Sequence, residues 1–421
     1  MRWEGISYNP HVRRIGLLAS SAAIAQAIPV LVSPLLTRLY SPADFGSAAV
    51  FGASLAILAA VATGRYHVAV LLPEEDHEAI RLVQLSALLA AATSLVVAGA
   101  VLLYVLLPWE NDALASLGPF IWLIPVGVLA TALLDVATNL SLRMDRTRTI
   151  VQSNITRAFV AAAAQLGAPA VTVGGRAGLI VGSLASTIAG VSNHIKVYRE
   201  MAVRSGCITV HALKVVARRY SRFPRYDILA NLANVSAYSL VVLAIGSVFT
   251  AHDLGQYSLA FRLLVLPSAV IGVAISQSYM REASIRRTDR DAAIRLFNKT
   301  GATLATLSLP LFAFLYLLAG PLFGFAFGEE WRSAGSVAQA LIPQVWLRFV
   351  ASPMTSVFPI YGRQAQLLGV QLTLLVAMLA PVMSATLMGW SFLTSLRVQG
   401  LLMAVIYAFV YVASRRIVTR S

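Results

Sequence analysis

Long apolar stretches, separated by short polar segments, fill this chain from end to end. Each stretch holds about 18 residues or more, and a helix that rises 1.5 Å per residue needs about 20 apolar residues to cross a bilayer. The pattern therefore predicts an all-α polytopic membrane protein. Twelve transmembrane helices are predicted, at residues 15–37, 46–72, 82–107, 117–142, 155–173, 178–195, 228–249, 255–280, 301–327, 337–361, 366–390 and 395–413.

Basic residues set the predicted orientation, because Lys and Arg are retained in cytoplasmic loops. With the N-terminus inside, most of the 33 Lys and Arg residues fall in cytoplasmic segments. The predicted outside loops then hold only Arg38, Arg176, Arg332 and Arg397. An even number of spans places both termini in the cytoplasm, and we expect a multi-pass protein of a bacterial cytoplasmic (inner) membrane. The net charge of +15 follows from these loops, and we expect no nucleic-acid partner.

The longest predicted cytoplasmic connection divides the spans into two sets of six. It predicts a basic linker at 201–226, between an N-terminal six-helix lobe at 1–200 and a C-terminal six-helix lobe at 227–421. Six spans per half give both halves the same orientation, which implies parallel repeats about an axis normal to the membrane. We expect the two lobes to surround a central cavity.

Short sequence similarities between the two halves, which we call echoes, support this repeat. Segments 40–47 and 249–256 each place Asp, an apolar residue and Gly at the start of the next predicted helix, 209 residues apart. A second echo pairs Trp109 with Trp331, each beside acidic residues in a predicted outside loop. The Asp residues could also simply cap the helices that follow them.

Four of the arginines within the predicted spans or at their ends are candidate site residues, and they lie at inner, middle and outer depths. A charge at the bilayer centre costs about 2.5–3.5 kcal/mol on insertion scales. Arginines at such depths are therefore expected to have a function or an oppositely charged partner. Arg65 lies near an inner end, Arg348 near the middle of a span, and Arg262 and Arg38 toward the outside. If they share one cavity, they form a ladder for an anionic group, because guanidinium can bind two phosphate oxygens. Arg38 and Arg65 could instead extend to the interfaces.

Other polar residues also fall within the predicted spans. Asp135 is the carboxylate well inside a span, and it could pair with an arginine or bind a coupling H⁺ or Na⁺. Asn231 and Asn234 lie three residues apart on one helix face and are candidates to line the cavity. Asp227 lies at the mouth of the seventh span beside Arg225, where we expect an interfacial ion pair.

The sequence has no motif for catalysis or for a resident cofactor. Its His and Cys residues have no metal-ligand spacing, and no strand–helix unit surrounds the glycines at 174–178. We therefore expect a protein that is not an enzyme, has no catalytic residues and holds no metal. ATP would not drive it directly, and an H⁺ or Na⁺ gradient could supply the energy instead.

Several segments together resemble one family. The first predicted hairpin, residues 34–46 with Arg38 and Asp44, is the most specific, and the resemblance covers nearly the whole chain. It is to the bacterial polysaccharide and O-antigen flippases of the multidrug, oligosaccharidyl-lipid and polysaccharide exporter superfamily. The other segments that resemble this family are 62–73, 222–226, 257–264 and 327–335.

The resemblance implies a cargo and candidate contacts. The cargo would be an oligosaccharide linked through diphosphate to a polyprenol, with undecaprenol the expected one, moved from the inner to the outer leaflet. A polysaccharide polymerase and a chain-length regulator are the implied protein partners. Arg38, Arg65 and Arg262 lie in matching segments and become candidate diphosphate or sugar contacts, and Arg348 is added on its depth alone. The family leads us to expect a small polar residue where this chain has Asp227.

Other classes of protein stay open as alternatives. A cation-coupled drug or metabolite antiporter of the same superfamily usually needs acidic groups in its cavity, whereas the predicted intramembrane charge is mainly arginine. A membrane-embedded glycosyltransferase or polymerase needs catalytic carboxylates and usually a large outside loop, and the predicted outside loops are short. A purely structural scaffold would gain nothing from intramembrane arginines.

Overall fold

The computed structural model of the chain describes residues 10–107, 113–170, 175–204, 209–268 and 272–420. Every regular element in these ranges is helical. Seven of their helices are long and apolar enough to cross a membrane, or up to nine if each of two bent helix pairs counts as one span. The predicted all-α membrane architecture is confirmed, while the number of twelve spans stays a prediction. Trp109, one half of the second echo, lies outside the described residues.

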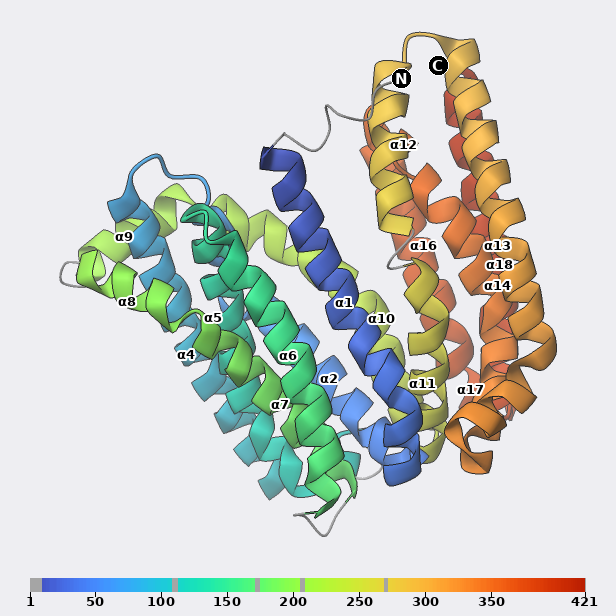
Figure 1. Cartoon of the computed structure of the whole chain (residues 1–421), viewed down its shortest axis with the longest axis horizontal. Helices are drawn as coiled ribbons and strands as arrows, with labels where there is room; N and C mark the ends of the chain where they lie inside the picture. Colours follow the sequence, from blue (N-terminus) through green and yellow to red (C-terminus); the bar gives the residue numbers. More distant parts are fainter. Residues whose placement is uncertain (1–9, 108–112, 171–174, 205–208, 269–271, 421) are drawn as a thin grey trace. The chain divides into compact units, whose positions relative to one another are not determined.

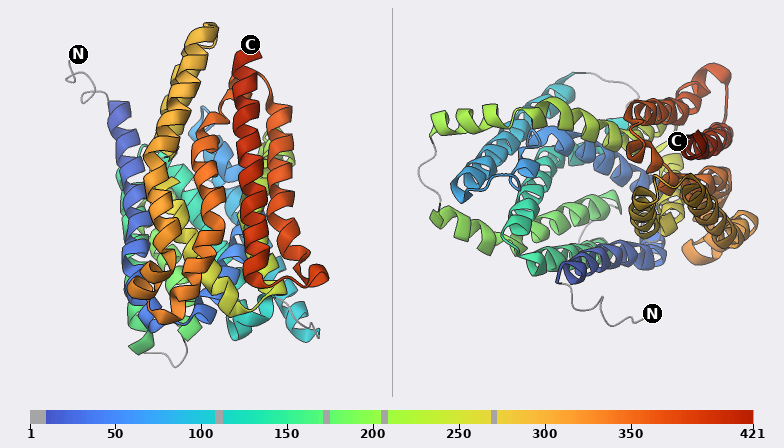
Figure 2. Two further views of the ribbon diagram at one scale, coloured as in Figure 1. Left: turned by 90° about the vertical axis from the view of Figure 1, so that its right-hand side faces the viewer. Right: turned by 90° about the horizontal axis from the view of Figure 1, so that it is seen from above.

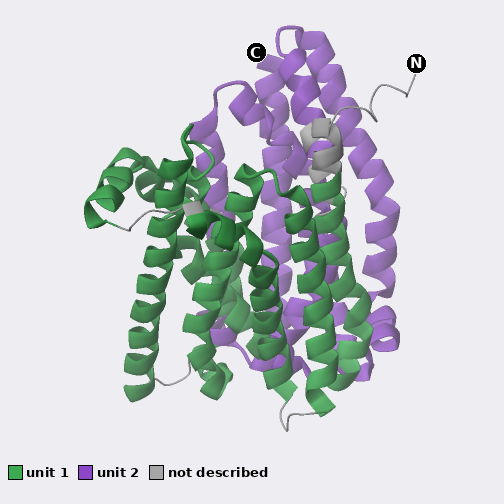
Figure 3. Ribbon diagram, turned by 60° about the vertical axis from the view of Figure 1, so that its left-hand side comes forward, with its two compact units in different colours: residues 1–40, 47–243 green, residues 41–46, 244–421 purple. Residues whose placement is uncertain are grey.

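The chain forms two compact units (Figure 3). Unit 1 comprises Met1–Tyr40 and Ser47–Leu243, and unit 2 comprises Ser41–Gly46 and Ala244–Ser421. Unit 1 therefore includes the segment 201–226 that the sequence predicts as a linker. The short segment 41–46 belongs to unit 2, although the residues on either side of it belong to unit 1.

The helices of unit 1 pack along one another (Figure 1). α5 contacts α4, α6 and α7, and α6 also contacts α1 and α7. Short helices α8 and α9 follow, and α9 packs on α4. The helices that start in or lead through this unit are α1 (Pro10–Leu39), α2 (Pro42–Ala62), α3 (Tyr66–Ala69), α4 (Asp76–Leu106), α5 (Leu123–Arg143), α6 (Thr147–Gly167), α7 (Gly175–Asn193), α8 (Ile195–Arg204), α9 (Val210–Arg219) and α10 (Ile228–Val248), with 3-10 turns at Ala113–Trp122 and Ala168–Ala170.

Unit 2 is built around three long helices that run side by side, α13, α14 and α18 (Figure 2). α11 and α12 pack against α14, and α16 packs against α18. The helices are α11 (Ala251–Pro267), α12 (Val273–Ile285), α13 (Arg290–Phe327), α14 (Arg332–Met354), α15 (Val357–Ile360), α16 (Gln364–Met383), α17 (Ala385–Met388) and α18 (Phe392–Arg420), with a 3-10 turn at Glu329–Trp331.

The predicted second span is interrupted. α2 ends at Ala62, and Gly64 and Arg65 follow with φ angles of 59° and 60°. These values lie in the left-handed region, which Gly adopts freely and other residues rarely do, so the helix stops and the chain turns into α3. The prediction of one helix over 46–72 is therefore wrong. Apolar residues continue beyond the turn, so the hydropathy pattern does not reveal it.

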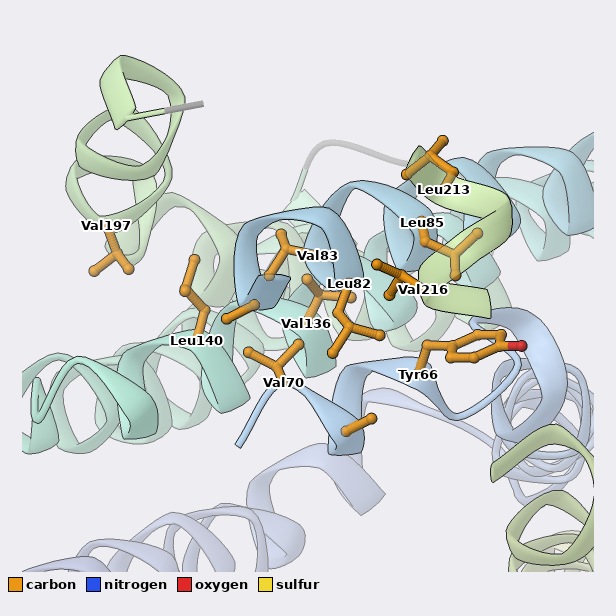
Figure 4. Close-up of a cluster of buried hydrophobic side chains, with 12 residues drawn as sticks. Tyr66, Val70, Leu82, Val83, Leu85, Val136, Leu140, Val197, Leu213 and Val216 are labelled. Atoms are coloured by element: carbon orange, nitrogen blue, oxygen red, sulfur yellow. The ribbon is translucent and has the colours of Figure 1, made fainter. Parts of the chain in front are cut away.

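A buried hydrophobic cluster in unit 1 holds the short helix α3 in place (Figure 4). Tyr66 and Val70 from the α3 region pack with Leu82 of α4, Leu140 of α5 and Val216 of α9. All five side chains are less than a tenth exposed. The turn at Gly64 and Arg65 is thus anchored by the apolar core on its C-terminal side.

The repeated segments meet within unit 2. A Cβ on Gly46 would lie 1.9 Å from the Ala251 carbonyl oxygen, and a Cβ on Gly255 would lie 1.7 Å from the Pro42 carbonyl oxygen. Pro42 and Gly46 each lie 209 residues before Ala251 and Gly255, so the two contacts are equivalent. The N-terminal turns of α2 and α11 therefore cross with local two-fold symmetry, which supports the predicted internal repeat.

Both of these turns are capped in the same way. The Ser41 backbone N–H donates to Asp44 Oδ2 at 3.0 Å, and the Asp44 N–H donates to Ser41 Oγ at 3.3 Å. The corresponding bonds between Thr250 and Asp253 measure 3.3 and 3.1 Å. Such reciprocal bonds satisfy backbone donors at a helix start. The two Asp residues therefore cap their helices and also mark the repeat.

We expect Gly46→Ala and Gly255→Ala each to destabilise the protein by about 1–3 kcal/mol or more, because the added methyl would overlap backbone atoms of the other helix. Gly52→Ala, in the same helix α2, is the matched control, since a Cβ there meets no atom within 4 Å. Thermal unfolding and size-exclusion profiles of the three purified variants measure the difference. Equal stability of all three would contradict the close crossing.

Candidate functional site

Arg65 and Asp227 form an ion pair in unit 1. Arg65 Nε donates to Asp227 Oδ2 at 2.7 Å, and the two side chains are 21% and 39% exposed. Arg65 directly precedes α3, and Asp227 ends a π-helical turn, Phe223–Asp227, that leads into α10. The ion pair predicted for Asp227 is confirmed, but its partner is Arg65 and not the neighbouring Arg225.

The backbone around Arg65 is fixed by contacts of the residues beside it. The Tyr66 hydroxyl donates to the Ala217 carbonyl oxygen at 3.1 Å, and Thr63 and His67 share a buried hydrogen bond. A non-glycine residue in the left-handed region costs about 1–3 kcal/mol and persists only where its surroundings determine it. The position of the Arg65 guanidinium is therefore set largely by the fold.

A shallow, open depression lies on the Asp227 side of this ion pair. Its volume is about 450 Å³, and it is lined by Arg222, Phe223, Tyr226, Asp227 and Ala230. Arg225, from the same turn, lies close enough to the Tyr66 hydroxyl to interact with it electrostatically. The π-helical turn therefore presents charged and aromatic side chains next to Arg65. Turns of this kind occur frequently at functional sites.

The group formed by Arg65, Arg222, Arg225 and Asp227 has an excess of positive charge. Three guanidinium groups accompany one carboxylate, and Arg222 and Arg225 are exposed. Guanidinium groups stay charged at any relevant pH and bind carboxylate or phosphate oxygens in pairs. The arrangement can therefore bind an anionic phosphate group, and we call these four residues the Arg65 site.

A second pair of opposite charges lies in the same unit. Asp135 of α5 interacts electrostatically with Arg157 of α6 and also with Arg65. The Arg157 side chain crosses Gly190 of α7, where a Cβ would lie 2.6 Å from Arg157 Cδ. The buried Arg157 Nε has no hydrogen-bond partner. Asp135 thus lies within electrostatic range of two arginines without a direct contact to either, and both its pairing and its role in ion coupling stay predictions.

Arg157 is absent from the site residues that the sequence predicts. The predicted fifth span begins at residue 155, which would place Arg157 at the membrane interface. α6 instead begins at Thr147, so Arg157 lies ten residues, or about 15 Å, along the helix. Polar side chains at 147–154 lower the local hydropathy and hide this earlier start. The signal that could have revealed Arg157 is its position within a run of helix-forming residues that starts before the apolar stretch.

The other predicted site residues lie on both units. Arg38 is exposed in the last turn of α1, and Arg262 of α11 and Arg348 of α14 are exposed on unit 2. Asn231 is half-buried in α10, while the side chain of Asn234 lies outside the described residues. Of the predicted set, unit 1 brings Arg65 close to Asp135. The arginine ladder and the cavity-lining asparagines stay predictions.

Arg143, at the C-terminal end of α5, is hydrogen-bonded to the segment that follows Arg65 and α3. Arg143 donates from Nη1 to the carbonyl oxygens of Val70 and Pro73 at 3.1 and 2.7 Å, and from Nη2 to Asp76 Oδ1 at 3.1 Å. Hydrogen bonds from a charged donor are stronger than those between neutral groups. This one side chain therefore ties the segment between α3 and α4 to α5.

Two more ion pairs attach α8 and α9 to this end of unit 1. Arg146 pairs with Glu200 of α8 at 2.9 Å, and Arg219 of α9 pairs with Glu78 of α4 at 2.9 Å. Burial, with the nearby Glu78 carboxylate as a further cause, raises the pKa of the Tyr220 hydroxyl at the end of α9. The segment predicted as a linker is thus docked on unit 1 by charge as well as by apolar contact.

We expect Arg157→Leu to destabilise the protein by about 1–2 kcal/mol, because it removes a positive charge within electrostatic range of a largely buried carboxylate. The double variant Asp135→Asn with Arg157→Leu should regain most of the loss. Chemical or thermal unfolding of the three variants in detergent tests the pair, and strictly additive losses would contradict it.

Comparison with known proteins finds one matching family and several solved structures with a similar fold. A family model described as "Polysaccharide biosynthesis protein" matches residues 35–336. Among solved structures, the lipid II flippase MurJ in an inward closed conformation has a TM-score of 0.70 at 11% identity, over 96% of this chain and 90% of that chain. No curated protein matches this chain.

Two solved structures described as multidrug resistance MATE family transporters of the MOP superfamily are also similar. The inward-facing one has a TM-score of 0.62 at 14% identity, over 96% of this chain and 94% of that chain. The outward-facing one has a TM-score of 0.54 at 13% identity, over 97% and 96%. At these identities the likeness shows a shared transporter fold. The family model covers most of the chain, Arg38, Arg65 and Arg262 included, and the chain belongs to the polysaccharide biosynthesis protein family.

Proposed function

We propose that this chain is a flippase that moves a polyprenyl-diphosphate-linked oligosaccharide from the inner to the outer leaflet of the bacterial cytoplasmic membrane. The cargo would be a repeat unit of O-antigen, capsule or exopolysaccharide, carried on undecaprenol. The observation that carries the proposal is the Arg65 site, where Arg65 pairs with Asp227, Arg222 lines the same shallow depression as Asp227, and Arg225 belongs to the same turn. The family and the transporter fold are consistent with this activity.

The physical problem of such a cargo explains why arginines are needed. The polyprenyl tail is soluble in lipid, whereas the diphosphate and the sugars must cross an apolar layer. A hydrated, cationic path lowers the cost of moving the diphosphate, and arginine binds phosphate oxygens without losing its charge. Alternating access then needs no covalent chemistry. We propose twelve helices in two lobes around a central cavity, with both termini in the cytoplasm, as the frame for this motion.

Asp135 is the proposed coupling group. Uptake of H⁺ or Na⁺ there would cancel its charge and leave Arg65 and Arg157 with more free positive charge. An anionic cargo would then bind more strongly, so a gradient of the coupling ion could drive the cycle. The charge pattern of unit 1 supports this proposal, because one carboxylate lies within electrostatic range of two arginines.

The alternative function is a cation-coupled drug or metabolite antiporter of the same superfamily. A cationic cargo requires an acidic site, and the Arg65 site is basic, so its charge favours an anionic cargo. A polysaccharide polymerase and a chain-length regulator would act on the repeat unit after its transfer. We include them as proposed partners for that reason.

We expect Arg65→Ala and Arg348→Ala each to abolish export of the repeat unit in a deletion strain, because each removes a proposed phosphate contact. Surface polysaccharide should fall by about tenfold or more, the loss expected for one charged contact. A complete, unpolymerised repeat unit on its lipid carrier should accumulate and be visible by mass spectrometry of extracted lipids. The mass of that lipid would also identify the cargo.

Arg146→Ala is the matched control, because Arg146 is an arginine of the same unit that pairs with Glu200 in a separate ion pair. Export by this variant should be near normal, and membrane levels of all variants should be similar. Normal export by both Arg65→Ala and Arg348→Ala would disprove the arginine ladder. A deletion strain with normal surface polysaccharide and an unchanged lipid pool would disprove the proposed function.

A further inference from the structure

We infer that α8 and α9 form an interfacial surface that binds anionic phospholipid headgroups of the cytoplasmic leaflet. Each helix would keep one side on the core of unit 1 and place its exposed side among the headgroups. This lipid contact rests on the proposed orientation of the chain and not on the proposed cargo. Three observations carry it: the docking of the two helices, the residues on their exposed sides, and the charge of the segment.

Both helices pack on unit 1 through their buried sides (Figure 4). Val197 of α8 and Leu213 and Val216 of α9 belong to one buried cluster with Leu82 of α4 and Leu140 of α5. The ion pair that each helix makes with this unit adds to the docking. Each helix therefore has one side fixed by the core, and the opposite side is available to a partner.

The junction between α7 and α8 places α8 at the membrane surface. The axes of the two helices differ by 44°, and the buried His194 between them lies 2.7 Å from the Ser141 hydroxyl through its Nδ1. α8 carries Lys196, Arg199 and Glu200 in its first two turns, and charges at this density are costly in hydrocarbon. The apolar helix α7 thus tethers a charged helix beside the headgroups, where its effective concentration is high.

The exposed side of α8 alternates apolar and cationic residues. Ile195, Arg199 and Val203 follow one another at intervals of four residues and so lie on one face, with Lys196 beside them. Ile195 and Val203 are 44% and 87% exposed. A face in contact with water alone gains nothing from these branched aliphatic side chains. The boundary between headgroups and acyl chains favours such a mixture.

The exposed side of α9 repeats this arrangement. Val210, Lys214 and Arg218 are again four residues apart and exposed, and Val215 is exposed on the adjoining part of the helix. The two valines are 68% and 49% exposed. Lys and Arg can lay their aliphatic stems along apolar surface and keep their charges among the headgroups. Both helices therefore have the composition of interfacial helices on the side away from the core.

The charge of these faces selects an anionic partner. Glu200 is the sole acidic residue between positions 195 and 226, and it pairs with Arg146. The four exposed cations of the two faces form no ion pair with any described residue. Each Lys or Arg close to an anionic membrane surface raises affinity about fivefold. A nucleic acid would also attract this charge but would not account for the exposed aliphatic residues, so a lipid surface is favoured.

The test uses the purified full-length chain in phosphatidylcholine nanodiscs, with a bimane fluorophore on His211→Cys. His211 is exposed on α9, and the sole native cysteine is removed by Cys207→Ser. The nanodiscs contain a fixed fraction of phosphatidylglycerol or of phosphatidylcholine that is brominated near the top of its acyl chains, because bromine quenches bimane on contact. We expect phosphatidylglycerol to quench at least about fivefold more effectively, and this preference to fall as salt is raised.

Lys214→Gln with Arg218→Gln should reduce the preference to about twofold or less, because it removes two cations near the fluorophore. Arg148→Gln with Arg287→Gln is the matched control. It removes the same charge from exposed arginines outside α8 and α9, and the preference should not change. Val210→Gln should weaken quenching by both lipids and leave the preference intact, since it removes apolar contact only.

Equal quenching by the two lipids, or a preference that persists in the α9 double variant, would overturn the inference. If that variant does not fold, as judged by size exclusion, a preference that is insensitive to salt in the unchanged chain would overturn it equally. Protection of the fluorophore from both lipids would also overturn it and would assign the exposed faces to a partner in the cytosol. The proposed function is judged separately, by the lipid that accumulates in the deletion strain.

Discussion

The need to compensate charge within an apolar helical framework governs the first unit of this protein. Arg65 pairs with Asp227, and Arg157 lies within electrostatic range of Asp135. Removing the counter-charge of a poorly hydrated group is costly, because that group is then left uncompensated. These interactions join elements that are distant in the sequence.

The second unit depends on a different and more rigid contact. The turns at Gly46 and Gly255 approach so closely that each carbonyl oxygen occupies the place of the other helix's missing side chain. The Phe45 and Trp331 rings pack edge to face beside them, with centroids 4.8 Å apart. A backbone contact of this kind has no alternative arrangement, whereas a partly exposed ion pair does. The protein thus combines a permanent crossing in one unit with exchangeable charge contacts in the other.

Much of the architecture follows from local features of the sequence. Apolar stretches predict the all-helical membrane class, and the echo of Asp and Gly residues 209 positions apart predicts a repeat that the glycine contacts support. The break at Gly64 and Arg65 is not predictable from hydropathy, because it depends on backbone angles. The partner of Arg65 is also hidden, since Asp227 lies 162 residues away and only the fold brings them together. Arg157 is missed because polar residues conceal the start of its helix.

The charges of unit 1 alternate in sign from Asp227 to Arg65, Asp135 and Arg157. Under the proposed function, this alternation couples the binding of the cargo to the binding of the coupling ion. A diphosphate bound beside Arg65 would add negative charge in the electrostatic range of Asp135, which makes uptake of a cation by Asp135 more favourable. Uptake there in turn strengthens the hold of Arg65 on the diphosphate. Because linked binding is reciprocal, cargo and coupling ion would favour each other's binding without any direct contact between them.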